Sequence, residues 1–134
     1  MEQIGRDPNN IYGSLHAPSF DVTGGYNGGG FSDDYHTYAA NWQPDRVEFY
    51  VDGHNFATYY KSQSGGHWPF EGKNFFILLN LAVGGNWPGY PDGSTQFPQK
   101  YYIDYIRVYE AAWMNEETKE VDVVVEAAEE VFLQ

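Results

Sequence analysis

Apolar and polar residues alternate along much of this chain, and the alternation predicts β-strands. The clearest example is RVEFYVDG (46–53), whose valines and phenylalanine share one face while Glu48 and Tyr50 share the other. Its closing Asp-Gly pair is typical of a hairpin turn, and HNFATYYK (54–61) is predicted to return as the partner strand. The preceding stretch DDYHTYAANW (33–42) also alternates and predicts a third strand.

Other stretches are less regular. Residues 1–16 predict a short strand, the turn GRDPNN and a second strand, IYGSLH. Residues 17–32 hold five glycines, which are unfavourable inside a sheet, so we expect a long loop there. A loop of that length in a compact domain is often functional.

The second half of the chain contains its most apolar run, NFFILLNLAVGG (74–85). Such a continuous run predicts a central strand covered on both faces. A loop rich in proline and glycine follows over residues 86–98, and KYYIDYIRVYE (100–110) predicts the last strong strand.

The character of the chain changes after Glu110, where glycine and proline disappear. Asn115 could cap a helix that has two glutamates in its first turn, whereas VDVVV favours a strand. Both alternatives stay open. We expect residues 1–110 to form one domain and residues 111–134 an acidic tail, a linker or the start of a further module.

Composition narrows the class of protein. Aromatic residues make up 19% of the chain, and abundant tyrosine and tryptophan suit both a β-sandwich core and the recognition of sugar rings. The net charge of −12 comes without a cluster of basic residues, so we expect neither a nucleic acid nor a membrane as partner. The absence of cysteine excludes disulfides, thiolate metal sites and cysteine nucleophiles. No apolar run approaches 18 residues.

Antiparallel strands joined by hairpins and glycine-rich loops predict a β-sandwich or jelly roll. Four stretches, in order, sharpen this picture: MEQIGRDPNNIYGSLHAPSF, YHTYAANWQPDRVEFYVDG, FFILLNLAVGGNWPG and YYIDYIRVYE. Together they resemble the C-terminal half of the catalytic domain of family 16 glycoside hydrolases, laminarinases (endo-β-1,3-glucanases) above all. The resemblance covers residues 1 to about 110. It implies an all-β, partial concanavalin A-like jelly-roll β-sandwich with a concave carbohydrate cleft, and a β-glucan as partner.

The family carries its catalytic carboxylates in a Glu-x-Asp-x-x-Glu motif. Met1 and Glu2 are similar to the end of that motif, so the resemblance implies that Glu2 is the general acid/base. The nucleophile would then lie before residue 1. A retaining glycosidase needs both carboxyls, roughly 5–5.5 Å apart. We therefore expect this chain alone to be inactive on internal β-1,3 or mixed β-1,3/1,4 linkages. The alternative is a non-catalytic β-glucan-binding module.

Four further residues are candidates for substrate binding. Trp87 lies in a glycine- and proline-rich loop with little core to fill, so its indole is free to stack on a sugar ring. His16 resembles a family histidine beside the acid/base, and His36 one in a family His-Thr-Tyr strand; each has a packing role as its alternative. Asn80 interrupts an apolar run, where its amide would either bind ligand or hydrogen-bond internally. Trp68 is a weaker loop candidate.

Asp104 falls on the predicted inward face of the last strand, among apolar residues. The resemblance implies a structural calcium ligand there, with most of the 6–8 oxygens that calcium takes lying outside this chain; an ion pair with an arginine is the alternative. The resemblance also implies an extracellular or periplasmic location. Because cutting a jelly roll exposes strand edges, we expect one of three outcomes: the chain self-associates, its tail covers an edge, or it folds poorly alone.

Overall fold

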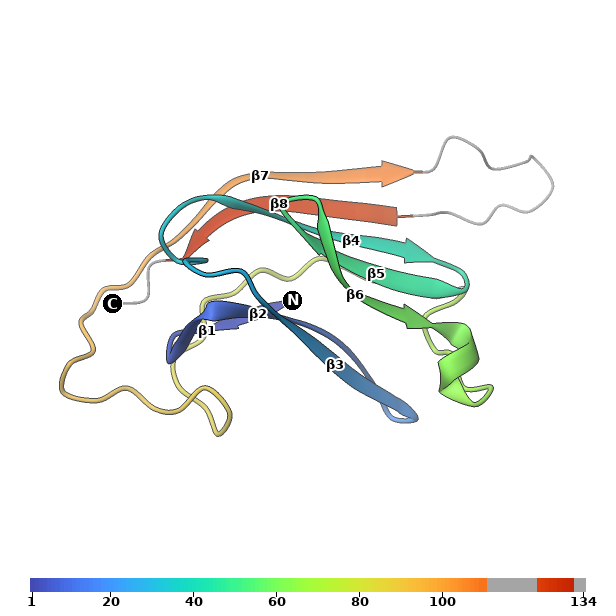
Figure 1. The fold of residues 1–134 in the computed structure, drawn as a ribbon, viewed down its shortest axis with the longest axis horizontal. Coiled ribbons are helices and arrows are strands. Elements are labelled where there is room, and N and C mark those ends of the chain that lie inside the picture. The colour runs from blue at the N-terminus through green and yellow to red at the C-terminus, as the bar shows by residue number, and fades with distance from the viewer. Residues whose placement is uncertain (111–122, 132–134) are drawn as a thin grey trace.

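The computed structural model describes the backbone of residues 1–110 and 123–131 and the side chains of residues 1–109. The regular secondary structure of this part is almost entirely β, with antiparallel pairing throughout and one short 3-10 helix, η1 (Lys61–Ser64). Figure 1 shows two sheets, the smaller lying against the larger. In the described part, no helix has the length and apolar character needed to cross a membrane.

The smaller sheet has the strand order β1-β2-β3 and contains β1 (Glu2–Ile4), β2 (Asp7–Ala17) and β3 (Phe20–Asn27). The larger has the order β6-β5-β4-β8-β7. Its strands are β4 (His36–Gln43), β5 (Arg46–Val51), β6 (His54–Tyr60), β7 (Tyr101–Glu110) and β8 (Val123–Val131).

The predictions for residues 33–61 and 100–110 are confirmed as strands. In β5 every second side chain is buried, as the alternation predicts. The turn after it places both Asp52 and Gly53 at positive φ, 49° and 76°, which is the geometry of a two-residue hairpin turn.

The core lies between the two sheets. Gly13 of β2 faces Phe49 of β5 so closely that a Cβ on Gly13 would lie 2.8 Å from the phenylalanine ring. Only glycine fits that approach. Two buried clusters fill the space between the sheets: Leu15, Phe20, Val47, Phe49, Trp68 and Phe70 form one, and Ile11, Phe31, Tyr38 and Val51 the other.

Two predictions near the N-terminus are wrong. The predicted six-residue turn reduces to two residues, because β2 already begins at Asp7. Residues 20–27, predicted as loop, form β3. Gly24 and Gly25 lie inside this strand because aromatic side chains cover them: a Cβ on Gly24 would lie 2.8 Å from the Tyr59 hydroxyl, and one on Gly25 3.1 Å from the Tyr12 ring.

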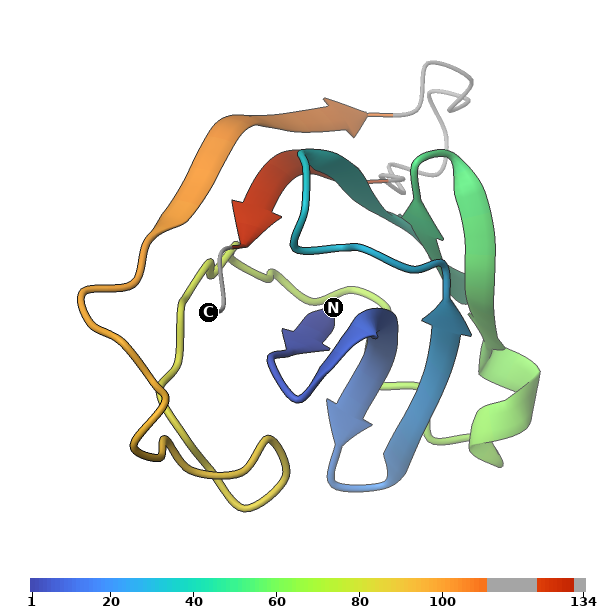
Figure 2. The same ribbon diagram turned by 60° about the vertical axis from the view of Figure 1, so that its left-hand side comes forward.

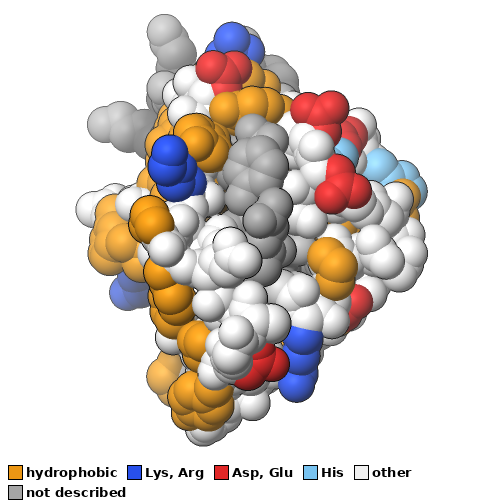
Figure 3. Space-filling view, turned by 90° about the vertical axis from the view of Figure 1, so that its left-hand side faces the viewer, with side chains coloured by type: hydrophobic (Ala, Val, Ile, Leu, Met, Phe, Trp, Pro, Cys, Tyr) orange, Lys and Arg blue, Asp and Glu red, His pale blue; other side chains and the backbone are white. Residues whose placement is uncertain are grey.

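The prediction of a central strand over residues 74–85 is also wrong. The segment is extended but joins no sheet among the described residues. Most of its side chains are exposed, Phe76 to 85%, while Leu79 and Leu81 are half-buried. The physical reason is the lack of a neighbour: no described strand pairs with either edge. Hydrophobic side chains also gather in a column on the face drawn in Figure 3.

The tail supplies a strand rather than a helix over residues 123–131. β8 pairs with β4 on one side and with β7 on the other, so it holds a central place in the larger sheet (Figure 2). The alternative of a helix beginning at Asn115 lies outside the described residues. The division of the chain after residue 110 stays a prediction.

Trp68 belongs to the core and not to a binding loop. Its ring is buried and makes edge-on contacts with Phe20 and Phe70, with ring centroids 5.5 and 5.0 Å apart. The surface role predicted for Trp68 is therefore wrong, because β3 and the segment after η1 together cover the indole.

Candidate active site

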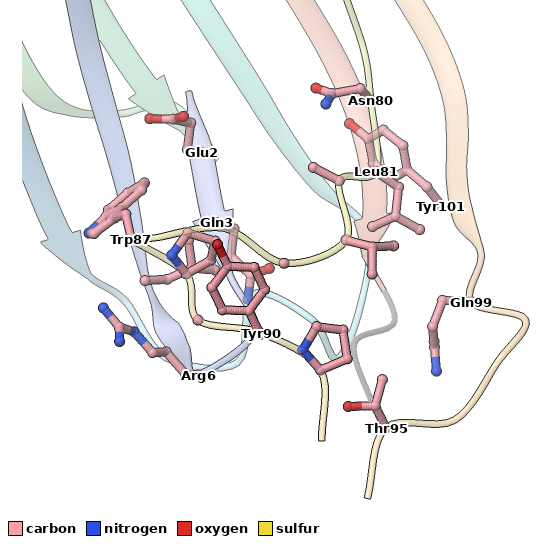
Figure 4. Close-up of a pocket in the computed structure, with 18 of the residues that line it drawn as sticks. Glu2, Gln3, Arg6, Asn80, Leu81, Trp87, Tyr90, Thr95, Gln99 and Tyr101 are labelled. Atoms are coloured by element: carbon pink, nitrogen blue, oxygen red, sulfur yellow. The ribbon is translucent and has the colours of Figure 1, made fainter. Parts of the chain in front are cut away.

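A cavity of about 590 Å³ opens between β1 and the chain that runs from residue 80 to residue 101 (Figure 4). Three of the residues predicted for the site line this cavity: Glu2, Asn80 and Trp87. The remaining lining comes from β1 and its turn, from Ile11 and Tyr38 at the sheet surfaces, and from Leu81, Val83, Tyr90, Asp92, Thr95, Gln99 and Tyr101.

Glu2 is placed by β1, which forms one edge of the smaller sheet. Glu2 lies opposite Tyr12 in the ladder with β2, and the pairing register shifts between Gln3 and Ile4. Ile4 is buried, which anchors the short strand, whereas Glu2 is exposed. The carboxylate therefore reaches the cavity, on the same wall as Trp87 (Figure 4).

Trp87 stands at the tip of a small loop closed by two backbone hydrogen bonds between Gly85 and Gly89, at 2.8 and 3.0 Å. The φ of Gly89 is +90°, a conformation that favours glycine. The indole meets the Tyr12 ring edge-on, with centroids 5.1 Å apart, and stays 42% exposed. Tyr12 thus supports the indole and leaves surface open for a ligand.

A polar contact fixes Tyr12 in turn. The Tyr12 hydroxyl donates to the Asp7 carboxylate at 2.6 Å, and the Asn10 amide donates to the same carboxylate at 2.6 Å. These bonds hold the pKa of Asp7 below its ordinary value of 3.8, and the same tyrosine bond raises the pKa of Tyr12 above 10.0. Tyr12 was missed from the sequence; its signal is a tyrosine on the polar face of a predicted strand near Glu2.

Asn80 lies across the cavity from Glu2, beside Tyr101 (Figure 4). It is exposed, so its amide has water available and needs no internal partner. Tyr90 lines the same cavity and donates its hydroxyl proton to Asn86 at 3.1 Å. The wall opposite Glu2 therefore offers the Asn80 amide and the Tyr101 hydroxyl to a ligand (Figure 4).

The two predicted histidines lie outside the lining of this cavity. His16 is exposed on β2 and pairs with Asp21 across the hairpin, Nδ1 to Oδ1, at 2.8 Å. Because it is four residues from Tyr12 on a regular strand, it lies on the same sheet face, about 13 Å further along. A sugar contact for His16 stays a prediction.

His36 lies at the start of β4, away from the cavity lining. Its Nδ1 is 2.7 Å from Asp52 Oδ2, and its ring meets Phe31 edge-on. Its Nε2 is buried without a hydrogen-bond partner in the described structure. These contacts favour packing, the alternative for this residue; a role in binding stays a prediction.

Asp104 is exposed, and so are Ile106 and Val108 of the same predicted face, so its inward orientation stays a prediction. The ladder between β7 and β8 is irregular between Ile103 and Tyr105, next to Asp104. Among the described residues no group of three or more acidic, histidine or cysteine side chains could hold a metal ion. A calcium-ligand role for Asp104 stays a prediction.

Comparison with known proteins shows which family the chain belongs to. Residues 1–107 match the model of glycosyl hydrolases family 16. The beta-glucanase of Rhodothermus marinus is 30% identical over 125 residues, which are 81% of this chain and 42% of that protein. A beta-1,3-glucan-binding protein of Penaeus monodon is 32% identical over 91 residues, 54% of this chain and 24% of that protein.

A solved structure, the endo-beta-1,3-glucanase from Pyrococcus furiosus, superposes with a TM-score of 0.67 at 30% identity. The match covers 98% of this chain and 46% of that chain, and the chain spans less than half the length of all three relatives. This structural match confirms the predicted all-β fold, a partial jelly-roll β-sandwich. The chain belongs to glycosyl hydrolase family 16.

Proposed function

We propose that this chain contributes the acid/base side of a site that hydrolyses internal β-1,3 or mixed β-1,3/1,4 glucan linkages with retention. The family and its relatives support β-glucan hydrolysis or binding. The observation that carries the proposal is the meeting of the Glu2 carboxylate and the Trp87 indole in one cavity. A stacking surface beside a proton donor is the arrangement that a glycosidase needs.

The proposed reaction has two steps. In the first, a carboxylate attacks the anomeric carbon while Glu2 gives its proton to the departing glycosidic oxygen, and a glycosyl ester forms. In the second, Glu2 takes a proton from water, and the resulting hydroxide displaces the carboxylate from the anomeric carbon. The sugar leaves with its original configuration because each step inverts it.

The second carboxylate must come from elsewhere. Of the described acidic residues, Glu2 and Asp92 line the cavity. The Asp92 carboxylate accepts from the backbone N–H and the hydroxyl of Ser94, at 2.8 and 2.6 Å, and these bonds lower its pKa. The Asp92 carboxylate is therefore engaged by hydrogen bonds within the turn that contains it. We therefore propose that the chain alone binds glucan without cleaving it.

In this proposal Trp87 stacks on a pyranose ring, and Asn80 hydrogen-bonds sugar hydroxyls from the opposite wall. His16 would extend the binding face along β2, where its imidazole is accessible. His36 would act indirectly, through the position of β4. A structural calcium at Asp104 and an extracellular or periplasmic location remain proposals that rest on the family resemblance.

Azide rescue tests the acid/base role with the chain as it exists. Azide takes the place of the missing carboxylate, attacks the anomeric carbon and yields an α-glycosyl azide, while Glu2 protonates the departing oxygen. With laminarihexaose we expect this product by mass spectrometry. Glu2→Gln should abolish it, since an amide cannot donate that proton. An undiminished yield in Glu2→Gln would contradict the role of Glu2.

The second candidate is a non-catalytic β-glucan-binding module. It is favoured by the glucan-binding relative and because, of the two described acidic residues that line the cavity, Asp92 is hydrogen-bonded within its own turn. It shares the Trp87 surface but assigns no chemistry to Glu2. Binding of laminarihexaose with no glycosyl azide at any azide concentration is the result that selects this candidate.

A further inference from the structure

The loop that carries Trp87 presents a second aromatic ring to the cavity, that of Tyr90. Among the described tyrosines Tyr90 is the most exposed, at 74%, and Trp87 is 42% exposed. Both side chains line the cavity that Glu2 borders (Figure 4). Exposed aromatic side chains are common on protein surfaces, so exposure alone does not assign Tyr90 a binding role.

Glycines fix the backbone of this loop. Gly85 and Gly89 form a β-bridge on either side of the turn 86–88, and two backbone hydrogen bonds of 2.8 and 3.0 Å join them. The φ of Gly84 is +72° and that of Gly89 is +90°, conformations that residues with a side chain rarely adopt. The loop therefore holds the residues of its turn, and the residue after it, in a defined position.

Prolines restrict the same loop further. Pro88 follows Trp87, and Pro91 follows Tyr90. A proline restricts the backbone of the residue before it, because its ring clashes with the amide and the Cβ of that residue. Both aromatic residues of the loop thus have limited backbone freedom before any ligand binds.

The Tyr90 side chain is held as well. A Cβ on Gly84 would lie 3.1 Å from Cδ1 of the Tyr90 ring, so the ring packs against the Gly84 backbone. At the other end of the side chain, the Tyr90 hydroxyl donates to Asn86 Oδ1 at 3.1 Å. An aromatic ring that is held in place but left uncovered loses little conformational entropy when a ligand covers it.

The two rings rest on different supports. Trp87 contacts the Tyr12 ring of β2 edge-on, with centroids 5.1 Å apart. Tyr90 is held from within the loop, by Gly84 and Asn86. The loop therefore offers two separate aromatic surfaces to one cavity. Each of these surfaces suits the apolar face of one sugar ring.

We propose that Tyr90 is a second stacking residue of this site, which binds a glucosyl unit other than the one on Trp87. One glucan chain then contacts the loop at two of its units, so Tyr90 determines how strongly the affinity increases with chain length. That the ligand is a β-glucan rests on the proposed function. The role of Tyr90 does not require Glu2 to transfer a proton.

The test is an NMR titration at the Trp87 indole nitrogen with a series of sugars from methyl β-glucoside to laminarihexaose. In the unaltered chain we expect the affinity to rise in a step at the chain length that first reaches both rings. Tyr90→Ala should remove this step and weaken the binding of laminarihexaose about fivefold, while methyl β-glucoside binds as before. Tyr90→Phe keeps the ring and should keep the step.

Two controls accompany the titration. Tyr60→Ala is the matched variant, because Tyr60 is an exposed tyrosine on β6 outside the cavity lining, and the step should persist in it. The indole signal of the sugar-free protein should be the same in Tyr90→Ala and in the unaltered chain, which would show that Trp87 keeps its position.

The outcomes distinguish this proposal from the proposed catalytic role. A step of unchanged size in Tyr90→Ala overturns the stacking role and leaves the azide test of Glu2 intact. A displaced indole signal in sugar-free Tyr90→Ala, with equal losses for all sugars, makes Tyr90 a support of Trp87 and also overturns the stacking role. Loss of the step, together with no glycosyl azide from the unaltered chain, upholds the role of Tyr90 and contradicts that of Glu2.

Discussion

At the scale of single residues, a chain of contacts connects Asp7 to the candidate site. Asp7 accepts the hydroxyl proton of Tyr12, the Tyr12 ring supports the Trp87 indole, and the indole shares a cavity with Glu2. Glu2 and Trp87 could be predicted from the sequence because each lies in a recognisable motif. Tyr12 was missed, since its contact with the indole depends on a loop 75 residues away.

Removing the indole tests the binding surface. Trp87→Ala should weaken binding of laminarihexaose about tenfold, because one aromatic contact contributes about 0.5–1.5 kcal/mol beyond area burial. Titration calorimetry measures the affinity. Tyr60→Ala, an exposed aromatic residue outside the cavity, should leave it unchanged. Equal losses in both variants would contradict a specific role for Trp87.

The Asp7–Tyr12 bond predicts a pH dependence of stability. The folded-state pKa of Asp7 is below its ordinary value of 3.8, so the bond stabilises the fold above that pH. The contribution is lost as the pH falls through the lowered pKa. Tyr12→Phe should therefore reduce the slope of melting temperature against pH on the acid side. The same slope in wild type and variant would show that the bond contributes nothing.

At the scale of elements, local patterns predicted β5, whose alternation is complete, and its hairpin partner β6, which the Asp-Gly turn indicates. Local patterns failed where contacts with residues distant in the sequence determine whether a strand forms. The glycines of β3 read as a loop because the aromatic rings covering them come from β2 and β6. The run 74–85 has a strand's composition, but strand formation needs a neighbour, and the described chain provides none.

The close approach of β2 to β5 predicts a large effect of one methyl group. Gly13→Ala places a Cβ 2.8 Å from the Phe49 ring in the core, so we expect a loss of about 1–3 kcal/mol in the free energy of unfolding. Urea denaturation measures it. Gly93→Ala, whose Cβ would meet nothing within 4 Å, is the matched control and should be nearly neutral.

The central place of β8 is testable through its backbone. Val125 pairs with Ala40 of β4 and with Val108 of β7. Val125→Pro removes a backbone donor inside the sheet, so we expect faster amide exchange in both neighbours and a loss of about 1–3 kcal/mol. Val125→Ile keeps the donor and should change little. Unaltered exchange in β4 and β7 after the proline substitution would argue against this strand position.

At the scale of the whole molecule, the family match ends at residue 107, whereas β8 lies beyond it and still holds a place between two strands of the matched region. The larger sheet therefore depends on a segment outside the family match. The smaller sheet ends at β1, which puts Glu2 at an open edge. Sequence patterns could not show either feature, because both depend on which strands lie side by side.

The most direct test of the whole account is a titration with laminarihexaose followed by NMR at two atoms: the Glu2 carboxyl carbon and the Trp87 indole nitrogen. If both act on one bound glucan, both signals shift and saturate with the same dissociation constant. Binding that leaves the Glu2 signal unmoved, or that moves the two signals with different dissociation constants, would contradict a common site.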